Sequence, residues 1–539
     1  MRQIVDDKTN EVAWKKFLLL PVVLHTTTDR AELRDRLDIL QADGCKWCHF
    51  PLRRFKHKQP PAVHHHVEDP FPRSQLDSEI LDKDWTPQQL RTKRYLEHQN
   101  LSSAMRALMS DSTFVIPTAQ TLEKLQDKHP AASKAGLTEA QLQELNDAVV
   151  EEAELVKVSL HDVRRVVRKA ANLKAPGLDL LRFEHLKQLI GKGPTPAPGD
   201  ETVFCDLLAK IIEILIAGEV PKRVLPAFRD NVLCPLPKGE QDIRPIGMGA
   251  LYRKIGSKIL EEYGRTFSAQ HFGDVQDAFK PDAIANIVHA FNFHMQEHPD
   301  HTVWLMDAEN AFNRGNRYLF LHETFEHCKF MFPLMRDMYY GESQGFVSGL
   351  EDGIHGVTSS EGFHQGDVLG TWAFTMTIQP LLNGLKKFIA AEFGNAVLVL
   401  IKFFVDDGNI SAPHPVLLKI IDFFLEEGPK YGYHISKKKG AFLLGKCASL
   451  QQAELQRQDL REKGFARDII KIHPDNIVGV AERTQAERNY GAKMLGSFIG
   501  HPAYIRCKLR EYIDQDLHVA AQRLKSYPDL QGQSVTFTF

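Results

Sequence analysis

Hydrophobic and polar residues alternate along this 539-residue chain with two different periods. Apolar positions recur at helical spacing over residues 138–173, in two pieces, and again over residues 203–221, which predicts amphipathic helices. Ser159 stands where the N-cap of the second piece is expected. From about residue 225 to residue 500, short apolar runs alternate with helical stretches. This mixture predicts an α+β fold.

Two of the apolar runs end in carboxylates. The run that ends in "FFVDDGNI" (403–410) carries the pair Asp406 and Asp407, and "VWLM" (303–306) is followed by Asp307. Asp-Gly between apolar strands is a strong hairpin signal, so the double aspartate can be an ordinary turn. Taken alone, Asp307 can equally be a helix cap or a surface acid. Three carboxylates at strand ends are also what a two-metal phosphoryl- or nucleotidyl-transfer site needs, with Mg²⁺ as the natural ion.

Two further segments carry groups that suit phosphates. The stretch "LCPLPKGEQDIRPIGMG" (233–249) holds Lys238 and Arg244 on a hairpin-like turn, where they could clamp a triphosphate. By itself it reads as a solvated turn. The stretch "GFHQGDVLG" (362–370) opens a long apolar helix, and its glycines let the backbone approach a ligand closely. By itself it reads as a core helix capped by Asp367.

The order of these segments carries a resemblance to a known family. In chain order the motifs are "KAPGLDLLRFEHLK" (174–187), "RPIGMGALYRKIGSKIL" (244–260), "DAENAFNRGNR" (307–317), "GFHQGDVLG" (362–370), "FFVDDGNI" (403–410), "GYHISKKKGAF" (432–442) and "KMLGSFIG" (493–500). Together they resemble the reverse transcriptase domain of LINE-like, non-LTR retrotransposons. That family is a right-hand polymerase with fingers, palm and thumb, so the resemblance implies an α+β fold of this architecture.

The resemblance also implies a division of the chain. Residues 155–505 would form the reverse transcriptase domain, with the fingers at about 155–295 and the palm at about 296–505. Residues 1–154 would be a helical, loop-connected N-terminal region of unknown role, and residues 506–539 a partial, truncated helical thumb. We see no endonuclease, cysteine/histidine knuckle or RNase H pattern. A fragment or a decayed element copy is therefore expected.

The family's functional residues map onto individual positions of this sequence. The resemblance makes Asp307, Asp406 and Asp407 the catalytic carboxylates and metal ligands. It implies nucleotide binding by Lys238, Arg244, Phe312, Gln365, Gly366 and Lys438, and primer support by Leu495 and Gly496. Lys438 stands for the run of three lysines at 437–439, because the family has one lysine near the triphosphate there.

Phe312 bears on the type of polymerase. It follows Asp307 by five positions, on the side of the motif that faces the sugar in this family. A bulky ring there leaves no room for a 2′-hydroxyl, so the pocket should prefer deoxynucleotides, which disfavours an RNA-dependent RNA polymerase. Plain core packing is the alternative for Phe312. The family usually has proline where this chain has Val368, a departure that lowers the expected rate without removing a metal ligand.

The implied activity is that of an RNA-directed DNA polymerase, a nucleotidyltransferase that adds dNTPs to a primer 3′-hydroxyl. The implied cofactors are two Mg²⁺ ions, with Mn²⁺ as a substitute. The implied partners are an RNA template, a DNA or RNA primer and dNTPs, with no membrane and with the oligomeric state left open. The rival hypothesis is a decayed, non-catalytic nucleic-acid-binding protein with the same fold.

Composition changes this picture little. The net charge of −2 and pI of about 6.9 do not favour a nucleic-acid partner, but local basic patches matter more than the total. No signal peptide or bilayer-spanning run is visible, which predicts a soluble intracellular protein, with nucleus and cytoplasm not distinguished. Cys45 and Cys48 with the histidines at 64–66 have a partial zinc pattern. Because the histidines are adjacent, a loop with incidental ligands is favoured.

Overall fold

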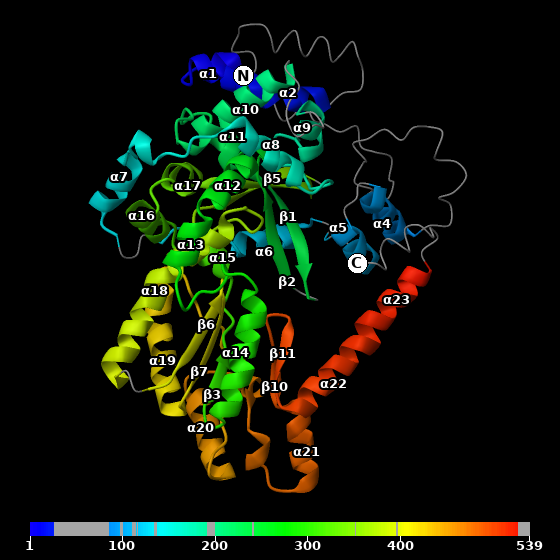
Figure 1. Cartoon of the computed structure of the whole chain (residues 1–539), viewed down its shortest axis with the longest axis vertical. Coiled ribbons are helices and arrows are strands. Elements are labelled where there is room, and N and C mark those ends of the chain that lie inside the picture. Colours follow the sequence, from blue (N-terminus) through cyan, green and yellow to red (C-terminus); the bar gives the residue numbers. More distant parts are fainter. Residues whose placement is uncertain are drawn as a thin grey trace.

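The computed structural model gives an elongated molecule whose described residues form two larger β-sheets, one two-stranded sheet and many helices (Figure 1). The described residues are 1–25, 86–97, 101–109, 115, 117–133, 137–190, 200–239, 242–350, 352–394 and 397–526. The cysteines and histidines of the partial zinc pattern lie outside these ranges. Within them, no helix combines the length and the apolar character needed to cross a bilayer.

Most of the residues that the structure describes before residue 272 are helical, and many of these helices lie in the upper part of Figure 1. They are α1 (Arg2–Asp6), α2 (Glu11–His25), α4 (Pro87–Glu97), α5 (Leu101–Met109), α6 (Ala119–Asp127), α7 (Glu139–Asp147), α8 (Leu160–Lys169), α9 (Phe183–Leu189), α10 (Asp200–Ile216), α11 (Pro226–Arg229), α12 (Leu251–Tyr263) and α13 (Arg265–His271). Ser159 caps α8, as predicted, in a capping box with Asp162. Residues 138–173 form two helices, α7 and α8, which confirms that prediction too.

The first sheet has the strand order β2-β1-β4-β5. Its strands are β1 (Asn231–Lys238), β2 (Asp242–Met248), β4 (Ser343–Leu350) and β5 (Gly353–Ser359). β1 and β2 form an antiparallel hairpin, as the sequence suggested, in which Leu236 pairs with Arg244. Alternate residues of β2 are buried, so Arg244 and its neighbours two positions away share the more open face.

The second sheet, β6-β7-β3-β8-β9, carries the predicted carboxylates. Its strands are β3 (Thr302–Leu305), β6 (Leu400–Phe404), β7 (Asp407–Ala412), β8 (Ala441–Leu443) and β9 (Ile470–Lys471). All four residues of β3 are buried, which confirms the predicted buried strand. β3 pairs with β7 on one side and β8 on the other, both antiparallel, so it is the centre of the sheet.

Both faces of the second sheet are covered, because successive side chains of a strand point to opposite faces. Trp304 packs against Phe424 and Phe442 on one face, where helices of the second half lie. Val303 and Leu305 join an apolar cluster on the other face. The helices of this half are α14 (Ala283–Glu297), α15 (Ala311–Arg314), α16 (Arg317–His327), α17 (Phe332–Tyr339), α18 (Gly370–Phe393), α19 (His414–Glu427), α20 (Leu450–Glu462) and α21 (Val480–Asn489).

The second covered face includes α14 and a separate hairpin, β10 (Gly491–Met494) and β11 (Ser497–Gly500). After β11, α22 (Pro502–Tyr512), a π-helical turn (Ile513–Leu517) and α23 (His518–Lys525) run along one side of the molecule (Figure 1). The Arg523 guanidinium donates to the Met109 carbonyl at 2.8 Å, so α23 ends against α5. The mixture of helices and sheets confirms the predicted α+β class.

Candidate active site

The double aspartate lies at the β6–β7 hairpin. Phe404 pairs with Asp407, so the two loop residues are Val405 and Asp406. The hairpin turn that the sequence suggested is therefore present, but Asp407 and Gly408 already belong to β7, and the turn is formed by the two residues before them. The reason is the left-handed backbone of Val405, with φ of +59°, which closes the turn one residue pair earlier.

The three carboxylates come together at this end of the sheet. The β3–β7 register pairs Leu305 with Asn409, and the ladder continues with a 2.8 Å bond from the Met306 N–H to the Gly408 carbonyl. Extending that register by two residues sets Asp307 opposite Asp407. A pocket of about 440 Å³ is lined by both of them. The structure therefore places Asp307 at the same end of the sheet as Asp406 and Asp407, which follow it by about a hundred residues in the sequence.

The acids perturb one another. Burial raises the pKa of Asp406, and the charge of Asp307 raises it further. Partial burial, Asp406 and Asp307 raise the pKa of Asp407 to about 6, although this side chain keeps an exposed edge. Clustered carboxylates with raised pKa values are the arrangement that a bound cation would stabilise.

The donor set fits Mg²⁺. In the described part of the chain no three His, Cys, Asp or Glu side chains already converge as a metal cage. Mg²⁺ does not require one, because it keeps several waters and is held through one or two carboxylates and the phosphates of a substrate. Asp307, Asp406 and Asp407 are the residues that would hold it.

A buried tyrosine that the sequence argument did not single out supports the loop. Tyr433 is fully buried, and its hydroxyl donates to the carbonyl of Asp406 at 2.8 Å. Tyr433 lies in the "GYHIS" segment, whose position beside Asp307 is fixed by a 2.8 Å bond from the Ser436 N–H to the Asp307 carbonyl. The segment was noticed for its lysines, and only the three-dimensional contact shows its role at the hairpin.

The predicted phosphate-binding cations lie within electrostatic reach of this site. Lys238 and Arg244 are exposed on the β1–β2 hairpin, and their charges lower the pKa of Asp406 against the effect of burial. Neither side chain forms a hydrogen bond or ion pair with another residue that the structure describes. The exposed run that contains Lys438 lies between Ser436 and Gly440, both of which contact the backbone around Asp307.

Gln365 and Gly366 join the two sheets. The Gly247 N–H of β2 donates to the Gln365 carbonyl at 2.7 Å, and the Gln365 amide donates to Asn313 beside the Asp307 motif at 3.2 Å. Gly366 has φ of +107°, and a Cβ there would lie 2.8 Å from the Gly247 carbonyl oxygen. Only glycine fits this position without moving the backbone.

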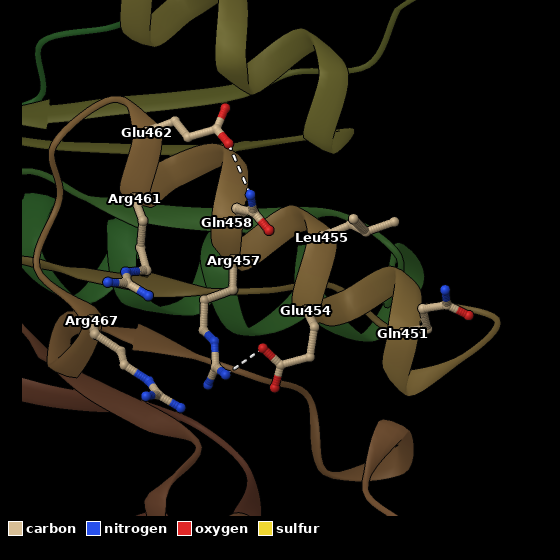
Figure 2. A pocket seen from close by; sticks show the side chains of 8 residues that line it. All are labelled: Gln451, Glu454, Leu455, Arg457, Gln458, Arg461, Glu462 and Arg467. Carbon is tan, nitrogen blue, oxygen red and sulfur yellow. Dashed lines mark hydrogen bonds and ion pairs between the residues drawn. The ribbon is translucent and has the colours of Figure 1, made fainter.

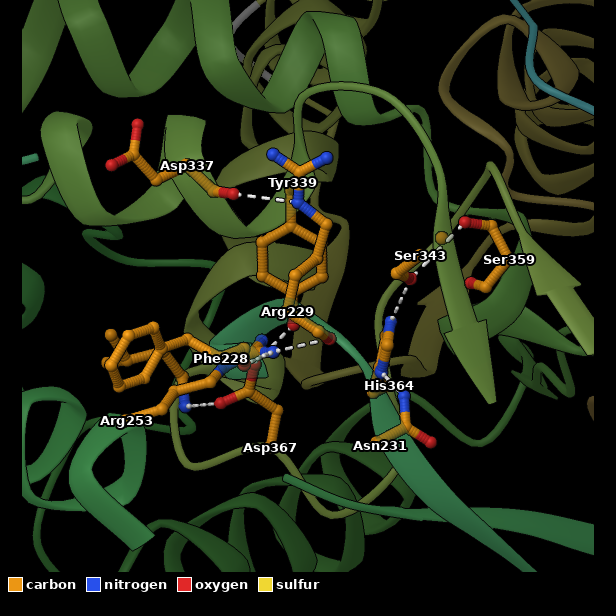
Figure 3. Close-up of polar contacts among 12 residues, drawn as sticks. Phe228, Arg229, Asn231, Arg253, Asp337, Tyr339, Ser343, Ser359, His364 and Asp367 are labelled. Atoms are coloured by element: carbon orange, nitrogen blue, oxygen red, sulfur yellow. Dashed lines mark hydrogen bonds and ion pairs between the residues drawn. The ribbon is translucent and has the colours of Figure 1, made fainter. Parts of the chain in front are cut away.

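Asp367 does not cap the following helix, so that prediction is wrong. The N-cap of α18 is Leu369, without a side-chain cap. One oxygen of the Asp367 carboxylate accepts the Leu369 N–H at 3.2 Å, just before the helix begins. The other accepts hydrogen bonds from the buried Arg253 of α12 and from the Tyr339 hydroxyl of α17 (Figure 3). A buried carboxylate needs such partners more than a helix end needs a cap.

His364 extends this polar network toward the first sheet. Its ring lies 2.6 Å from the Asn231 amide nitrogen and 3.1 Å from the Ser343 hydroxyl (Figure 3). Burial, together with the Arg253 charge, holds the pKa of His364 well below its ordinary value, so the ring is neutral. The network fixes the loop that carries Gln365 and Gly366 from both sides.

Phe312 lies on the short helix α15, partly buried, with its ring stacked on Phe374 at 5.4 Å. It is near the start of α18, since a Cβ at Gly370 would lie 3.7 Å from the Phe312 ring. Its position is compatible with both a pocket wall and core packing. The two residues predicted to support the primer, Leu495 and Gly496, form the two-residue turn of β10–β11, and Leu495 lines the same pocket as Asp307 and Asp407.

A separate pocket of about 550 Å³ lies along α20 (Figure 2). Three arginines, Arg457, Arg461 and Arg467, line it, and Arg457 forms an ion pair with Glu454. None of the predicted site residues lines it. The pocket along α20 is therefore separate from the predicted catalytic residues.

Comparison with known proteins finds a family match in the central part of the chain. Residues 236–496 match the family described as "Reverse transcriptase (RNA-dependent DNA polymerase)". This range contains every predicted site residue, and the match confirms the predicted α+β right-hand polymerase fold. The comparison with curated proteins found no match.

Solved structures show a more distant likeness. The apo telomerase of Candida tropicalis, truncated from its C-terminal domain, has a TM-score of 0.32 and 14% identity over 41% of this chain and 51% of its own. The Candida albicans telomerase in complex with a TWJ fragment of telomeric RNA has a TM-score of 0.29 and 12% identity, over 40% of this chain and 43% of its own. The chain thus spans about half the length of these structures or less.

Proposed function

We propose that this chain is an RNA-directed DNA polymerase that extends a primer 3′-hydroxyl with dNTPs. The observation that carries the proposal is the meeting of Asp307 with Asp406 and Asp407, at the end of β3 and the β6–β7 hairpin, inside a reverse transcriptase domain. The reaction joins the primer oxygen to the α-phosphate and releases pyrophosphate.

The residues of the chain would act mainly by positioning. Leu495 and Gly496 would support the primer end, which the pocket shared by Leu495 and the acids favours. Arg244 and Lys238 would bind the triphosphate, and Lys438, in the loop before β8, would add a further positive charge beside it. Divalent cations held by the three carboxylates would supply charge stabilisation for the attacking and leaving oxygens. Such preorganised charge is generally the largest part of catalysis of this kind.

We also propose that the polymerase is of the non-LTR retrotransposon type, with an RNA template and two Mg²⁺ ions. The support is the order of the seven sequence motifs over residues 155–505. Phe312, five positions after Asp307, supports dNTPs as substrates. The matched family describes RNA-dependent DNA polymerases, in agreement with an RNA template.

The rival is a non-catalytic nucleic-acid-binding protein with the same fold, which the Val368 departure favours. Two observations weigh against it. All three carboxylates are present, and the loop before Val368 keeps its anchors at Gly247 and Arg253. A decayed copy would have no reason to retain both.

Primer extension on an RNA template separates the two. Purified protein is given a labelled primer, dNTPs and Mg²⁺, beside the variant Asp406→Asn/Asp407→Asn, and binding of the template-primer is measured for both. We expect extension by the parent, none by the variant, and comparable binding. Absence of extension with intact binding would support the non-catalytic rival. Equal extension by both proteins would show that the acids were assigned wrongly.

A further inference from the structure

One buried glutamine holds the loop residue that precedes the double aspartate. Gln276 lies between α13 and α14, and its side chain is 1% exposed. Its amide nitrogen donates to the Val405 carbonyl at 3.0 Å, and the Val405 N–H donates to its amide oxygen at 2.9 Å. A single side chain thus binds both backbone polar groups of Val405.

The orientation of this amide is defined by a third bond. The Ala278 N–H also donates to the Gln276 amide oxygen, at 3.2 Å. An oxygen that accepts two N–H groups cannot exchange places with the NH₂ group, because that would set donors against donors. The Gln276 amide therefore has one orientation that satisfies all its neighbours.

The residue that it binds is strained. Val405 has φ of +59°, in the left-handed region that β-branched residues rarely adopt. Such a conformation persists only where the surrounding structure over-determines it. Val405 is also buried, and Asp406 and Asp407 follow it directly, so its backbone sets where both carboxylates point.

The support beneath Gln276 is itself fixed to the sheet. The Phe403 N–H donates to the Val275 carbonyl at 2.7 Å, and the Asp277 N–H donates to the Phe403 carbonyl at 2.9 Å. An ion pair of 3.2 Å between Lys402 and Asp277 adds a side-chain link. The segment around Gln276 thus runs parallel to β6 as an extra edge, bonded on both sides of the glutamine.

We propose that Gln276 is a positioning residue, which holds Val405 in the left-handed conformation from which the hairpin presents Asp406 and Asp407. It touches neither substrate nor carboxylate. It acts through the backbone of the loop and joins the segment between α13 and α14 to the reacting centre. The kinetic part of the proposal rests on the proposed polymerase function, whereas the structural part does not.

The test compares Gln276→Met with Gln276→Glu and a matched control, Gln379→Met. Methionine has a similar length and removes both bonds to Val405, whereas glutamate keeps an acceptor for the Val405 N–H. Gln379 is also buried, at 5% exposure, but its amide bonds Asn383 within α18. The readouts are hydrogen exchange at the Val405 amide, and kcat and KM for primer extension.

For Gln276→Met we expect faster exchange at Val405, with the paired amides of β6 and β7 still protected. We also expect kcat to fall about 10- to 100-fold, as for a misplaced reacting group, with KM for template-primer within about threefold. Gln276→Glu should lie between Met and the parent in both readouts, and Gln379→Met should match the parent in both.

Two results would overturn the proposal. One is unchanged exchange at Val405 in a folded Gln276→Met protein, and the other is an equal loss of kcat in Gln379→Met. If the parent protein extends no primer, the polymerase function fails, but the exchange result still decides whether Gln276 holds the loop.

Discussion

Two hairpins meet at the proposed site, and they are built in opposite ways. The β6–β7 hairpin presents Asp406 from its two-residue loop and Asp407 from the first residue of β7, and the loop backbone is bound by the buried Gln276 and Tyr433. The β1–β2 hairpin presents Lys238 and Arg244 as exposed side chains with no bond to another described residue. Carboxylates that repel one another are held by the fold, whereas the two cations that we propose to bind the triphosphate have exposed side chains that can adjust.

The difference follows from the electrostatics of each task. Holding like charges together costs free energy, which buried hydrogen bonds to the backbone can offset. Binding a triphosphate gains free energy from long, charged side chains that need no support before the ligand arrives. The comparison requires that two features affect activity: the fixed loop backbone of the β6–β7 hairpin and the exposed side chains of the β1–β2 hairpin.

Apart from loss of the carboxylates themselves, the largest effect is expected where the two sheets are joined. Gly366→Ala forces a Cβ to within 2.8 Å of the Gly247 oxygen at a positive φ, and should lower kcat/KM about 100-fold. Gly239→Ala, at the tip of the exposed hairpin, has a positive φ but nothing within 4 Å, and should change kcat/KM only a fewfold. Steady-state extension with both variants measures the contrast. Equal losses of kcat/KM in the two variants would mean that strain at a positive φ explains the effect and that the contact between Gly366 and Gly247 does not.

The sugar pocket is the next test. Phe312→Ala should raise the ratio of ribonucleotide to deoxynucleotide incorporation by about 10- to 100-fold, as expected when a packed wall is removed. Its stacking partner provides the control: Phe374→Leu disturbs the packing while keeping the wall at position 312. If Phe312→Ala discriminates between the two sugars as the parent does, the Phe312 ring contributes to core packing only.

A smaller change is expected at the exposed cations. Arg244→Ala should raise KM for dNTPs about tenfold, the value of one lost charged hydrogen bond of roughly 1.5 kcal/mol, with kcat nearly unchanged. Arg244→Lys should recover only part of it, because lysine cannot form a bidentate pair. The KM measurement is made at low and high salt, since exposed charges are screened. A fall in kcat with constant KM would contradict the role of an adaptable clamp.

The last prediction concerns folding stability rather than catalysis, at a buried carboxylate beside the start of α12. Asp179 is 5% exposed and accepts the Leu251 N–H of α12 at 2.6 Å. Burial raises its pKa to about 6. The folded protein therefore binds this proton more tightly than the unfolded chain, so the contribution is present below about pH 4 and is lost as pH rises through 6.

From that shift we expect Asp179 to lower stability by up to about 3 kcal/mol between pH 4 and pH 6. Asp179→Asn should flatten the stability curve in this window, as measured by urea unfolding at several pH values. Asp274→Asn, at an exposed side chain, should leave the slope as it is. Parallel curves for the parent and Asp179→Asn would contradict the assignment.

Sequence reasoning identified the acids because each follows a recognisable apolar run, although only β3 is buried throughout and β6 is mostly half-buried. It did not identify Gln276 or Tyr433, because neither residue belongs to a local sequence pattern that predicts its contact. Gln276 is about 130 residues away from the loop that it binds. Sequence reasoning also took Asp367 for a cap, because a carboxylate before a helix is usually one. Its true partners, Arg253 and Tyr339, come from two other helices and appear only when the chain is folded.

The most direct test of the central claim compares two acids that line one pocket. Asp307 and Asp468 both line the pocket of about 440 Å³, but only Asp307 continues the register to Asp407. Single-turnover primer extension is measured for Asp307→Asn and Asp468→Asn with saturating template-primer. The account predicts that Asp307→Asn abolishes extension while Asp468→Asn keeps a rate close to that of the parent. Extension by Asp307→Asn at the parent's rate would contradict the three-carboxylate site.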